Sequence, residues 1–344
     1  MPPVYEKKAP PNTKIPKLSA TLEDKKNYVV HIRNLEFYMD LRIKLIKIHQ
    51  ILKYNHSCWM AKYIDKCITL RKEATNEFDI ATWKLFVNAC FGKSVENFRK
   101  YQNFRIATKW GKRFGLGKSV QNPNFHKIKV FNENLAVIEM KKTKIIFNKP
   151  IYIGFCILEY NKLHLQKFHY EIMQKEFKND ISLMYTDSDC LIYLSKKHNI
   201  YEFIKSNSHL FDTSGYQKDN PYGIKLMNKR ELLLMKDENS GIPCIEGVFL
   251  RPKSYALRTA NDCTKKSKGV KHIVLESEVK FDDYKNCLFE NKKLYCNQNL
   301  IFTTNHKLYT IQQKKLAFCN SDDKRVVLCD GVNRLPYGHK HLKM

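Results

Sequence analysis

The sequence lacks the features that mark membrane and secreted proteins. None of its apolar runs approaches the roughly 18 residues that a membrane-spanning helix needs. Residues 1–8 have no apolar core of the kind that a signal peptide carries, and we find no lipidation signal. Eleven cysteines occur without a Cys-x-x-Cys pair, so a zinc site is not indicated. An odd number of cysteines favours reduced thiols, and we expect an intracellular protein, nuclear or cytoplasmic.

Acidic residues are scarce. The 344 residues include 34 Asp and Glu against 61 Lys and Arg, which gives a formal net charge of +27. The basic residues are spread along nearly the whole chain, and the hydrophobic fraction of 43% is ordinary for a folded protein. A folded domain this basic repels itself unless it meets a polyanion. We therefore expect nucleic acid, and not a membrane surface, as the partner.

Two carboxylates lie between two apolar runs. The runs, from Ile181 to Tyr185 and from Leu191 to Leu194, predict a hairpin with Asp187 and Asp189 at its turn. A spacing of two puts both carboxylates on one side of an extended chain, where they repel unless a cation lies between them. Mg²⁺, held by one or two carboxylates and by substrate phosphates, would remove this repulsion. Taken alone the pair is a weak signal, because most such pairs are solvated turn residues and some serve sugar-nucleotide transferases.

A helical region is predicted upstream, over residues 59–97. Within it Lys84, Asn88 and Phe91 fall at positions i, i+4 and i+7, so they share one face. A lysine can neutralise a phosphate, an amide can hydrogen-bond an oxygen and a ring can lie against a base, so this stripe suits a nucleoside triphosphate. Gly92 lets another backbone or a base pair approach closely. An ordinary amphipathic helix with a basic edge explains the stripe equally well.

The remaining patterns predict an α+β protein. We expect a strand at 43–48, loops and a small hairpin at 98–150, and a long helix that begins after Pro150 and leads into the acidic hairpin. A further strand is expected at 244–250, and helices at 276–290 and 303–316. The order of strand, helix and hairpin indicates a sheet that carries the acidic turn, with helices behind it.

The pattern Lys-x-x-x-Asn-x-x-aromatic-Gly followed by Tyr-x-Asp-x-Asp resembles family B DNA-directed DNA polymerases, in particular the protein-primed branch of viruses and virus-like DNA transposons. Similar segments extend the resemblance over nearly the whole chain: 26–31, 63–65, 71–74, 251–255, 268–270 and 335–339. The resemblance implies an α+β fold with a palm of antiparallel sheet backed by helices, helical fingers and a small thumb. The implied parts are a palm-proximal segment at 1–50, fingers at 51–100, an insertion at 101–149, the palm at 150–255, and the thumb and C-terminal tail at 256–344.

The resemblance also implies roles for individual residues. Asp187 and Asp189 match the acidic palm motif and would be catalytic metal ligands, with Asp189 the stronger candidate. The implied nucleotide-binding residues belong to the fingers: Lys84, Asn88, Phe91, Arg71 and Lys72. The implied DNA-binding residues include a Lys-x-Tyr element that holds the primer terminus: Gly92, Lys253, Tyr255 and Lys268.

The implied chemistry is in-line attack of a primer 3′-hydroxyl on the α-phosphate of a deoxynucleoside triphosphate, with two Mg²⁺ ions as cofactors. The implied partners are a DNA template-primer, deoxynucleoside triphosphates and a terminal protein that acts as primer.

The sequence departs from the family pattern. Mild changes affect both motifs, where Ala89, Phe91, Ser188 and Cys190 replace the usual Ser, Tyr, Thr and Ser. More important, the family's first metal-binding Asp motif, Asp-x-x-x-Leu-Tyr-Pro, is not found between residues 1 and 60, and the 3′–5′ exonuclease domain is missing. We therefore expect a C-terminal fragment with an incomplete metal site and little or no nucleotide incorporation on its own.

Two other classes stay open. A non-catalytic nucleic-acid-binding remnant of a transposon polymerase would use the +27 charge and be indifferent to Asp187 and Asp189. A reverse transcriptase or a sugar-nucleotide transferase is disfavoured, because the former usually has adjacent aspartates and the latter gives no reason for the lysine–asparagine helix.

Overall fold

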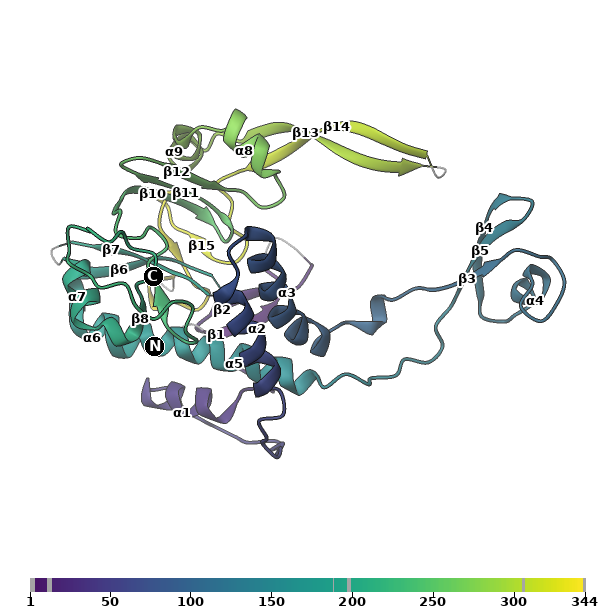
Figure 1. Cartoon of the computed structure of the whole chain (residues 1–344), viewed down its shortest axis with the longest axis horizontal. Helices are drawn as coiled ribbons and strands as arrows, with labels where there is room; N and C mark the ends of the chain where they lie inside the picture. The colour runs from purple at the N-terminus through teal and green to yellow at the C-terminus, as the bar shows by residue number, and fades with distance from the viewer. Residues whose placement is uncertain (1–3, 11–13, 188, 197–198, 305–306, 343–344) are drawn as a thin grey trace. The chain divides into compact units, whose positions relative to one another are not determined.

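Helices and small sheets alternate along the chain (Figure 1). The computed structural model describes residues 4–10, 14–187, 189–196, 199–304 and 307–342. They group into two units, Cys58–Leu158, and Met1–Ser57 together with Glu159–Met344. The predicted α+β class is confirmed at this level. Within the ranges just given, no helix is both long and apolar enough to cross a membrane.

The unit Cys58–Leu158 begins with two helices that form a hairpin, within the region 59–97 that was predicted to be helical. Helix α2 (Ala61–Glu73) packs against α3 (Glu77–Ser94). The side chain of Asn76 caps α3 by accepting a hydrogen bond from the Asp79 N–H at 2.8 Å. The acidic residues of the first turn lie at the positive end of the helix dipole, which stabilises the helix at this boundary.

A three-stranded antiparallel sheet follows in the same unit, where a simple hairpin was predicted. Its order is β3–β5–β4, with bounds Asn103–Ala107, Leu135–Met140 and Phe125–Asn132. A short helix, α4 (Leu116–Val120), lies beside the sheet (Figure 1). A small core joins them, made of Ala107, Ile138 and Met140 with Leu116 and Phe125.

The long helix predicted after Pro150 is confirmed. Helix α5 (Ile151–Lys167) continues as a π-helical turn (Phe168–Met173) and then as α6 (Gln174–Phe177). Pro150 suits the start of a helix because its missing N–H would have no partner there. The end of this helical stretch packs on the acidic hairpin through buried apolar side chains that include Phe168, Met173, Phe177 and Ile181.

A second three-stranded antiparallel sheet has the order β10–β11–β12, with bounds Cys244–Arg251, Ser254–Thr259 and Cys263–Lys266. The strand predicted at 244–250 is therefore confirmed. The helix predicted at 276–290 is two helices, α8 (His272–Glu278) and α9 (Phe281–Phe289). They separate at Val279, which is extended and buried, and Lys280 restarts the helix by donating its N–H to Asp283 Oδ2 at 2.7 Å.

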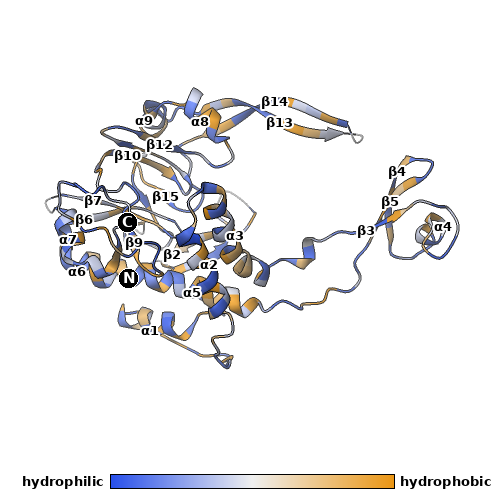
Figure 2. Cartoon of the chain, in the orientation of Figure 1, coloured by the Kyte–Doolittle hydropathy of each residue, from blue (hydrophilic) through white to orange (hydrophobic). Residues whose placement is uncertain are grey.

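A long two-stranded ribbon follows, formed by β13 (Leu294–Thr304) and β14 (Lys307–Phe318). The helix predicted at 303–316 is wrong, because residues Lys307–Phe318 form a strand that pairs with β13. Hydrophobic and hydrophilic residues both occur along this ribbon (Figure 2). The strand predicted at 43–48 is also wrong. Residues 43–58 form no helix or strand, and Ile46 is 89% exposed.

The remaining elements of this unit are short: β1 (Val4–Lys8) with β2 (Lys17–Thr21), α1 (Ile32–Asp40), α7 (Ile200–Ser206), parallel β8 (Phe211–Asp212) and β9 (Met235–Lys236), and β15 (Val326–Val327) with β16 (Arg334–Leu335).

Candidate functional site

The acidic residues lie at the turn of a hairpin, as predicted. Strands β6 (Ile181–Thr186) and β7 (Leu191–Ser195) pair in antiparallel fashion. The Asp187 N–H donates to the Cys190 carbonyl at 3.1 Å and closes the turn, while Ser188 lies outside the described residues. Asp187 is partly buried and Asp189 is exposed. The turn therefore holds one carboxylate against the protein and presents the other to solvent.

A second turn reaches the first from the hairpin of β10 and β11. Arg251 pairs with Ser254, so Pro252 and Lys253 form a two-residue turn. The Lys253 N–H donates to the Tyr185 hydroxyl at 2.8 Å, and Lys253 Nζ lies 2.7 Å from Asp187 Oδ2. The hydrogen bond to the Asp187 carboxylate raises the pKa of the Lys253 ammonium, while partial burial acts in the opposite direction. The two motifs, which lie 66 residues apart in the sequence, thus share a charged contact.

Lys253 has an unusual backbone conformation. Its φ is +64°, in the left-handed region that favours glycine. Pro252 fits the first turn position because its ring fixes φ near −65°. A lysine in the second position costs roughly 1–2 kcal/mol relative to a relaxed backbone. Such conformations cluster at functional sites, where neighbouring contacts hold them.

Packed aromatic rings connect the two hairpins. Tyr185 is buried, and its ring lies 5.6 Å from Phe249 and 4.9 Å from Tyr255, centroid to centroid. Burial raises the pKa of Tyr185 and of Tyr255, so both phenols stay neutral. Tyr255, a predicted primer contact, therefore lies beside the carboxylate turn through Tyr185. Tyr185 is the first residue of the Tyr-x-Asp-x-Asp motif, but the sequence pattern by itself does not predict this packing role.

The predicted nucleotide-binding residues lie in the other unit. Lys84 and Asn88 are exposed on α3, and Phe91 is partly buried. Nothing lies within 4 Å of a Cβ built on Gly92, so the helix surface there is open. Arg71 and Lys72 occupy the last turn of α2. The structure thus supports a continuous, accessible face on α3, while the carboxylates and Lys253 belong to the unit that contains β6 and β10.

Lys268 lies in the turn that follows β12 and is exposed. The next residue, Gly269, has φ +83°, and its carbonyl accepts a hydrogen bond from Lys315 Nζ at 2.7 Å. The Lys315 ammonium therefore lies at the residue that follows Lys268, near the base of the β13–β14 ribbon. A phosphate could be neutralised there, as the DNA-binding prediction requires.

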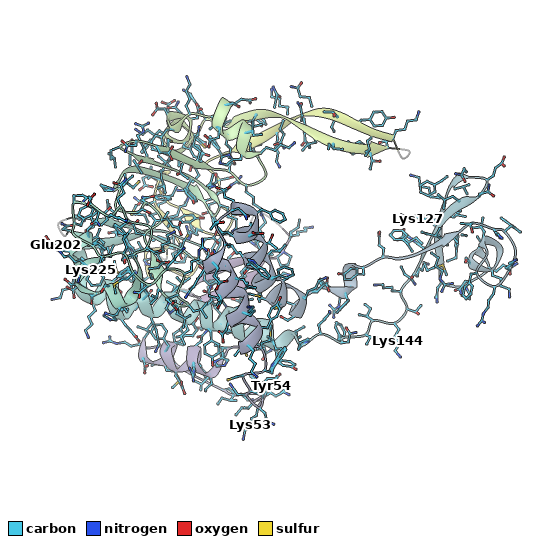
Figure 3. The ribbon with its side chains drawn as sticks, in the orientation of Figure 1. Lys53, Tyr54, Lys127, Lys144, Glu202 and Lys225 are labelled. Atoms are coloured by element: carbon cyan, nitrogen blue, oxygen red, sulfur yellow. The ribbon has the colours of Figure 1, made fainter. Side chains whose placement is uncertain are left out.

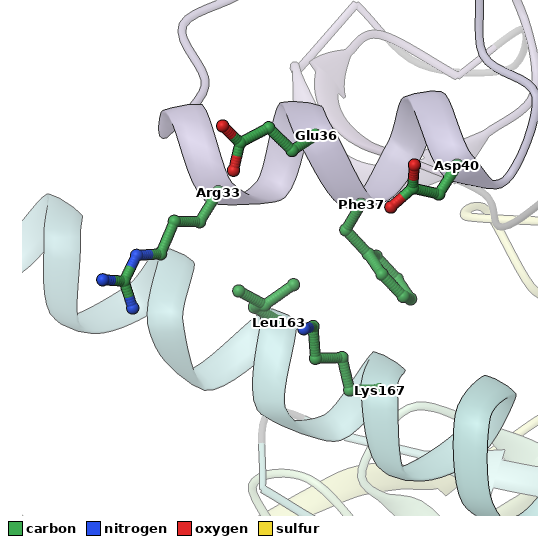
Figure 4. Close-up of a pocket in the computed structure, with 6 residues that line it drawn as sticks. All are labelled: Arg33, Glu36, Phe37, Asp40, Leu163 and Lys167. Carbon is green, nitrogen blue, oxygen red and sulfur yellow. The ribbon is translucent and has the colours of Figure 1, made fainter.

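A pocket of about 330 Å³ lies between α1 and α5 and includes none of the predicted site residues (Figure 4). Its lining mixes both signs of charge around one ring: Arg33, Glu36, Phe37, Asp40, Leu163 and Lys167. Lys167 Nζ lies 6.0 Å from the Phe37 ring. Two acidic and two basic side chains leave no net charge to attract a phosphate, so we do not assign this pocket to a nucleotide.

The acidic turn fits the way Mg²⁺ binds beside phosphates. Asp187 and Asp189 offer two carboxylates, and Mg²⁺ is commonly held by one or two carboxylates with substrate phosphates and water completing the shell. Within the described ranges no group of three or more His, Cys, Asp or Glu side chains gathers in one place. The ion would therefore depend on phosphate oxygens, and it would compete with the Lys253 ammonium for Asp187.

Comparisons with protein-family models, curated proteins and solved structures returned no match to this chain.

Proposed function

We propose that the chain is the fingers, palm and thumb portion of a family B DNA polymerase of the protein-primed type, with the subdomain bounds predicted above. The observation that carries the proposal is the contact between Lys253 and Asp187 at 2.7 Å. These residues come from two motifs, 66 positions apart, that the resemblance assigns to the primer terminus and to the metal site. A polymerase needs these two functions at the same place.

The residues have complementary tasks in this proposal. Asp187 and Asp189 bind the cation that accompanies the triphosphate. Bound Mg²⁺ would neutralise phosphate charge and polarise the attacking hydroxyl. Lys253 exchanges its partner Asp187 for a primer phosphate, and the Tyr185 and Tyr255 rings hold the turn in position. Lys84 neutralises the triphosphate, Asn88 hydrogen-bonds one of its oxygens, and the Phe91 ring lies against the base.

The proposal is tested by nucleotide binding. Binding of a fluorescent deoxynucleoside triphosphate to the full chain with template-primer is measured with and without Mg²⁺. We expect Asp189→Asn and Lys84→Ala each to weaken Mg²⁺-dependent binding about ten-fold or more, since each removes a charge-assisted contact. Asp219→Asn, which changes an exposed aspartate outside the motif, is the matched control. Equal affinities for Asp189→Asn and Asp219→Asn would refute the proposal.

One feature favours a second candidate, a non-catalytic nucleic-acid-binding protein. Lys253 already neutralises Asp187, and the described residues gather no third metal-ligating side chain beside the pair. In this case the +27 charge would bind DNA with a steep salt dependence. Asp187→Asn and Asp189→Asn would leave DNA affinity unchanged or raise it, and Mg²⁺ would not promote nucleotide binding.

A further inference from the structure

One face of the β3–β5–β4 sheet carries a groove with aromatic side chains and a basic edge. Its volume is about 360 Å³, which lies in the range of pockets that hold small organic groups. The residues that matter for its chemistry are Phe104, Phe131, Lys127, Lys129, Val137 and Glu139. None of these was assigned a role by the sequence motifs.

Strand alternation explains why these side chains meet. Phe104 pairs with Glu139, and Glu139 pairs with Lys127 on the other side, so the three form one row across the sheet. Val137 pairs with Lys129 in the next row. Ile138 stands between the two rows in sequence, is fully buried, and belongs to the core that contains Leu116 of α4. Successive side chains point to opposite faces, so α4 covers one face and the groove lies on the other.

The groove face is apolar and open. Phe104 is 54% exposed and Ile106, two residues along the same strand, is 69% exposed. Lys127, labelled beside this sheet in Figure 3, has a side chain that is 66% exposed. Large contiguous apolar surfaces that are exposed and rimmed by polar or charged residues are rare on soluble proteins, and they commonly mark binding sites.

The surrounding segment favours an anionic ligand. Residues 101–149 contain eleven Lys or Arg against two Glu and no Asp. Glu139, which lines the groove, is paired, because Lys127 Nζ lies 2.9 Å from its Oε2 and His126 Nδ1 lies 3.6 Å from its Oε1. Lys129 is exposed beside them. The groove therefore offers apolar walls and an excess of positive charge.

We propose that this groove binds a single-stranded segment of nucleic acid. Unpaired bases stack on Phe104 and Phe131, and the backbone phosphates contact Lys129. Aromatic side chains bind the flat faces of bases, which are accessible in a single strand and covered by neighbouring bases in a duplex. The site is independent of the carboxylate turn, so the inference goes beyond the proposed polymerase function.

The same unit exposes a second pair of aromatic rings, which can bind further bases of the same strand. Trp110 is 73% exposed and Phe114 is 79% exposed, in a loop that also contains Lys109, Lys112 and Arg113. Large rings among lysines and arginines are the combination that stacks bases while neutralising phosphates. We expect the groove to provide the central contacts and this loop to lengthen the footprint.

The test compares a single strand with its abasic counterpart. Binding of the full chain to a labelled 12-nucleotide thymidine strand is measured at raised salt, where phosphate contacts contribute least. Phe104→Ala is compared with Phe289→Ala, a substitution of a Phe that is 67% exposed on α9. We expect Phe104→Ala to weaken binding roughly five- to a hundred-fold, and Phe289→Ala to have no effect. The abasic strand should bind the wild type weakly and be insensitive to Phe104→Ala.

Two further measurements, photo-crosslinking and binding of a duplex, test the same proposal. A strand that carries 5-iodouracil should photo-crosslink to Phe104 or Phe131, and crosslinks confined to other parts of the chain would overturn the proposal. A hairpin duplex should bind equally to wild type and Phe104→Ala, and an equal loss for duplex and single strand would also overturn it. No triphosphate or Mg²⁺ is present, so these results do not depend on whether nucleotide binding at Asp187 and Asp189 succeeds or fails.

Discussion

The backbone N–H of Lys253 donates a hydrogen bond to the Tyr185 hydroxyl at 2.8 Å, and this bond joins the β10–β11 turn to the acidic hairpin. This bond positions the backbone of Lys253 and does not depend on what its side chain contacts. With the backbone positioned, the ammonium of the side chain contacts Asp187 Oδ2. The backbone bond therefore keeps Lys253 beside the acidic hairpin even when its ammonium exchanges the Asp187 carboxylate for a phosphate.

Removing the Tyr185 hydroxyl should weaken this connection between the two hairpins. We expect Tyr185→Phe to lower the free energy of unfolding by about 1 kcal/mol, because the Lys253 N–H loses its acceptor while the ring packing remains. The measurement is urea unfolding. Tyr255→Phe is the control, since the described residues show no hydrogen bond from the Tyr255 hydroxyl. An equal loss for both variants would contradict the account.

Substitutions at Lys253 separate backbone strain from charge. Lys253→Gly relieves a left-handed backbone that costs roughly 1–2 kcal/mol, and it gives up a largely exposed ion pair worth about 0–1 kcal/mol. We expect its stability to equal or exceed that of the wild type, while DNA binding weakens. Lys253→Ala loses the ion pair and keeps the strain, so it should be less stable than Lys253→Gly. If the two variants unfold at the same urea concentration, the turn is not strained.

A buried carboxylate holds α1 against α5. Glu159 is 3% exposed, its Oε2 accepts from Asn34 Nδ2 at 2.8 Å and from the His31 N–H at 3.3 Å, and its Oε1 accepts from Lys162 Nζ at 2.6 Å. Glu159→Ala leaves these donors unpaired, and we expect a loss of about 3 kcal/mol in the free energy of unfolding. Glu171→Ala, at an exposed position, should change it by less than about 0.5 kcal/mol. A small effect at Glu159 would show that water replaces the carboxylate.

Stability should fall in mild acid because of His169. Burial lowers the pKa of this imidazole, whose Nδ1 lies 3.0 Å from the Tyr193 hydroxyl and whose ring packs on Tyr170. The unfolded chain binds the proton more readily, with a pKa of about 6.5, so stability is lost as pH falls through that value toward the lower folded pKa. We expect His169→Gln to flatten the decline in unfolding free energy between about pH 7 and 5.

The control for this pH dependence is His272→Gln, which changes an exposed histidine. It should leave the pH profile of the wild type intact. A steep acid decline that persists in His169→Gln would assign the titration to other groups.

Local patterns predicted the helical region at 59–97, the long helix after Pro150 and the acidic hairpin, because each has a clear period or a defined start. The β13–β14 ribbon was missed because residues 303–316 fit a helix as well as a strand, and pairing with β13 decides between them. The break at Val279 was missed because its burial depends on the tertiary core. The contact between Lys253 and Asp187 joins distant parts of the chain, so no local pattern could predict its geometry.

Iron-mediated cleavage tests the central claim most directly. Fe²⁺ takes the place of Mg²⁺ and, with ascorbate and peroxide, generates radicals that cut the backbone near the bound ion. With template-primer and deoxynucleoside triphosphate present, we predict cuts near Asp187, Asp189 and Lys253 in the wild type and in Asp219→Asn, and their loss in Asp189→Asn. Cleavage elsewhere in the chain, or the same pattern in Asp189→Asn, would contradict a nucleotide-metal site at the acidic hairpin.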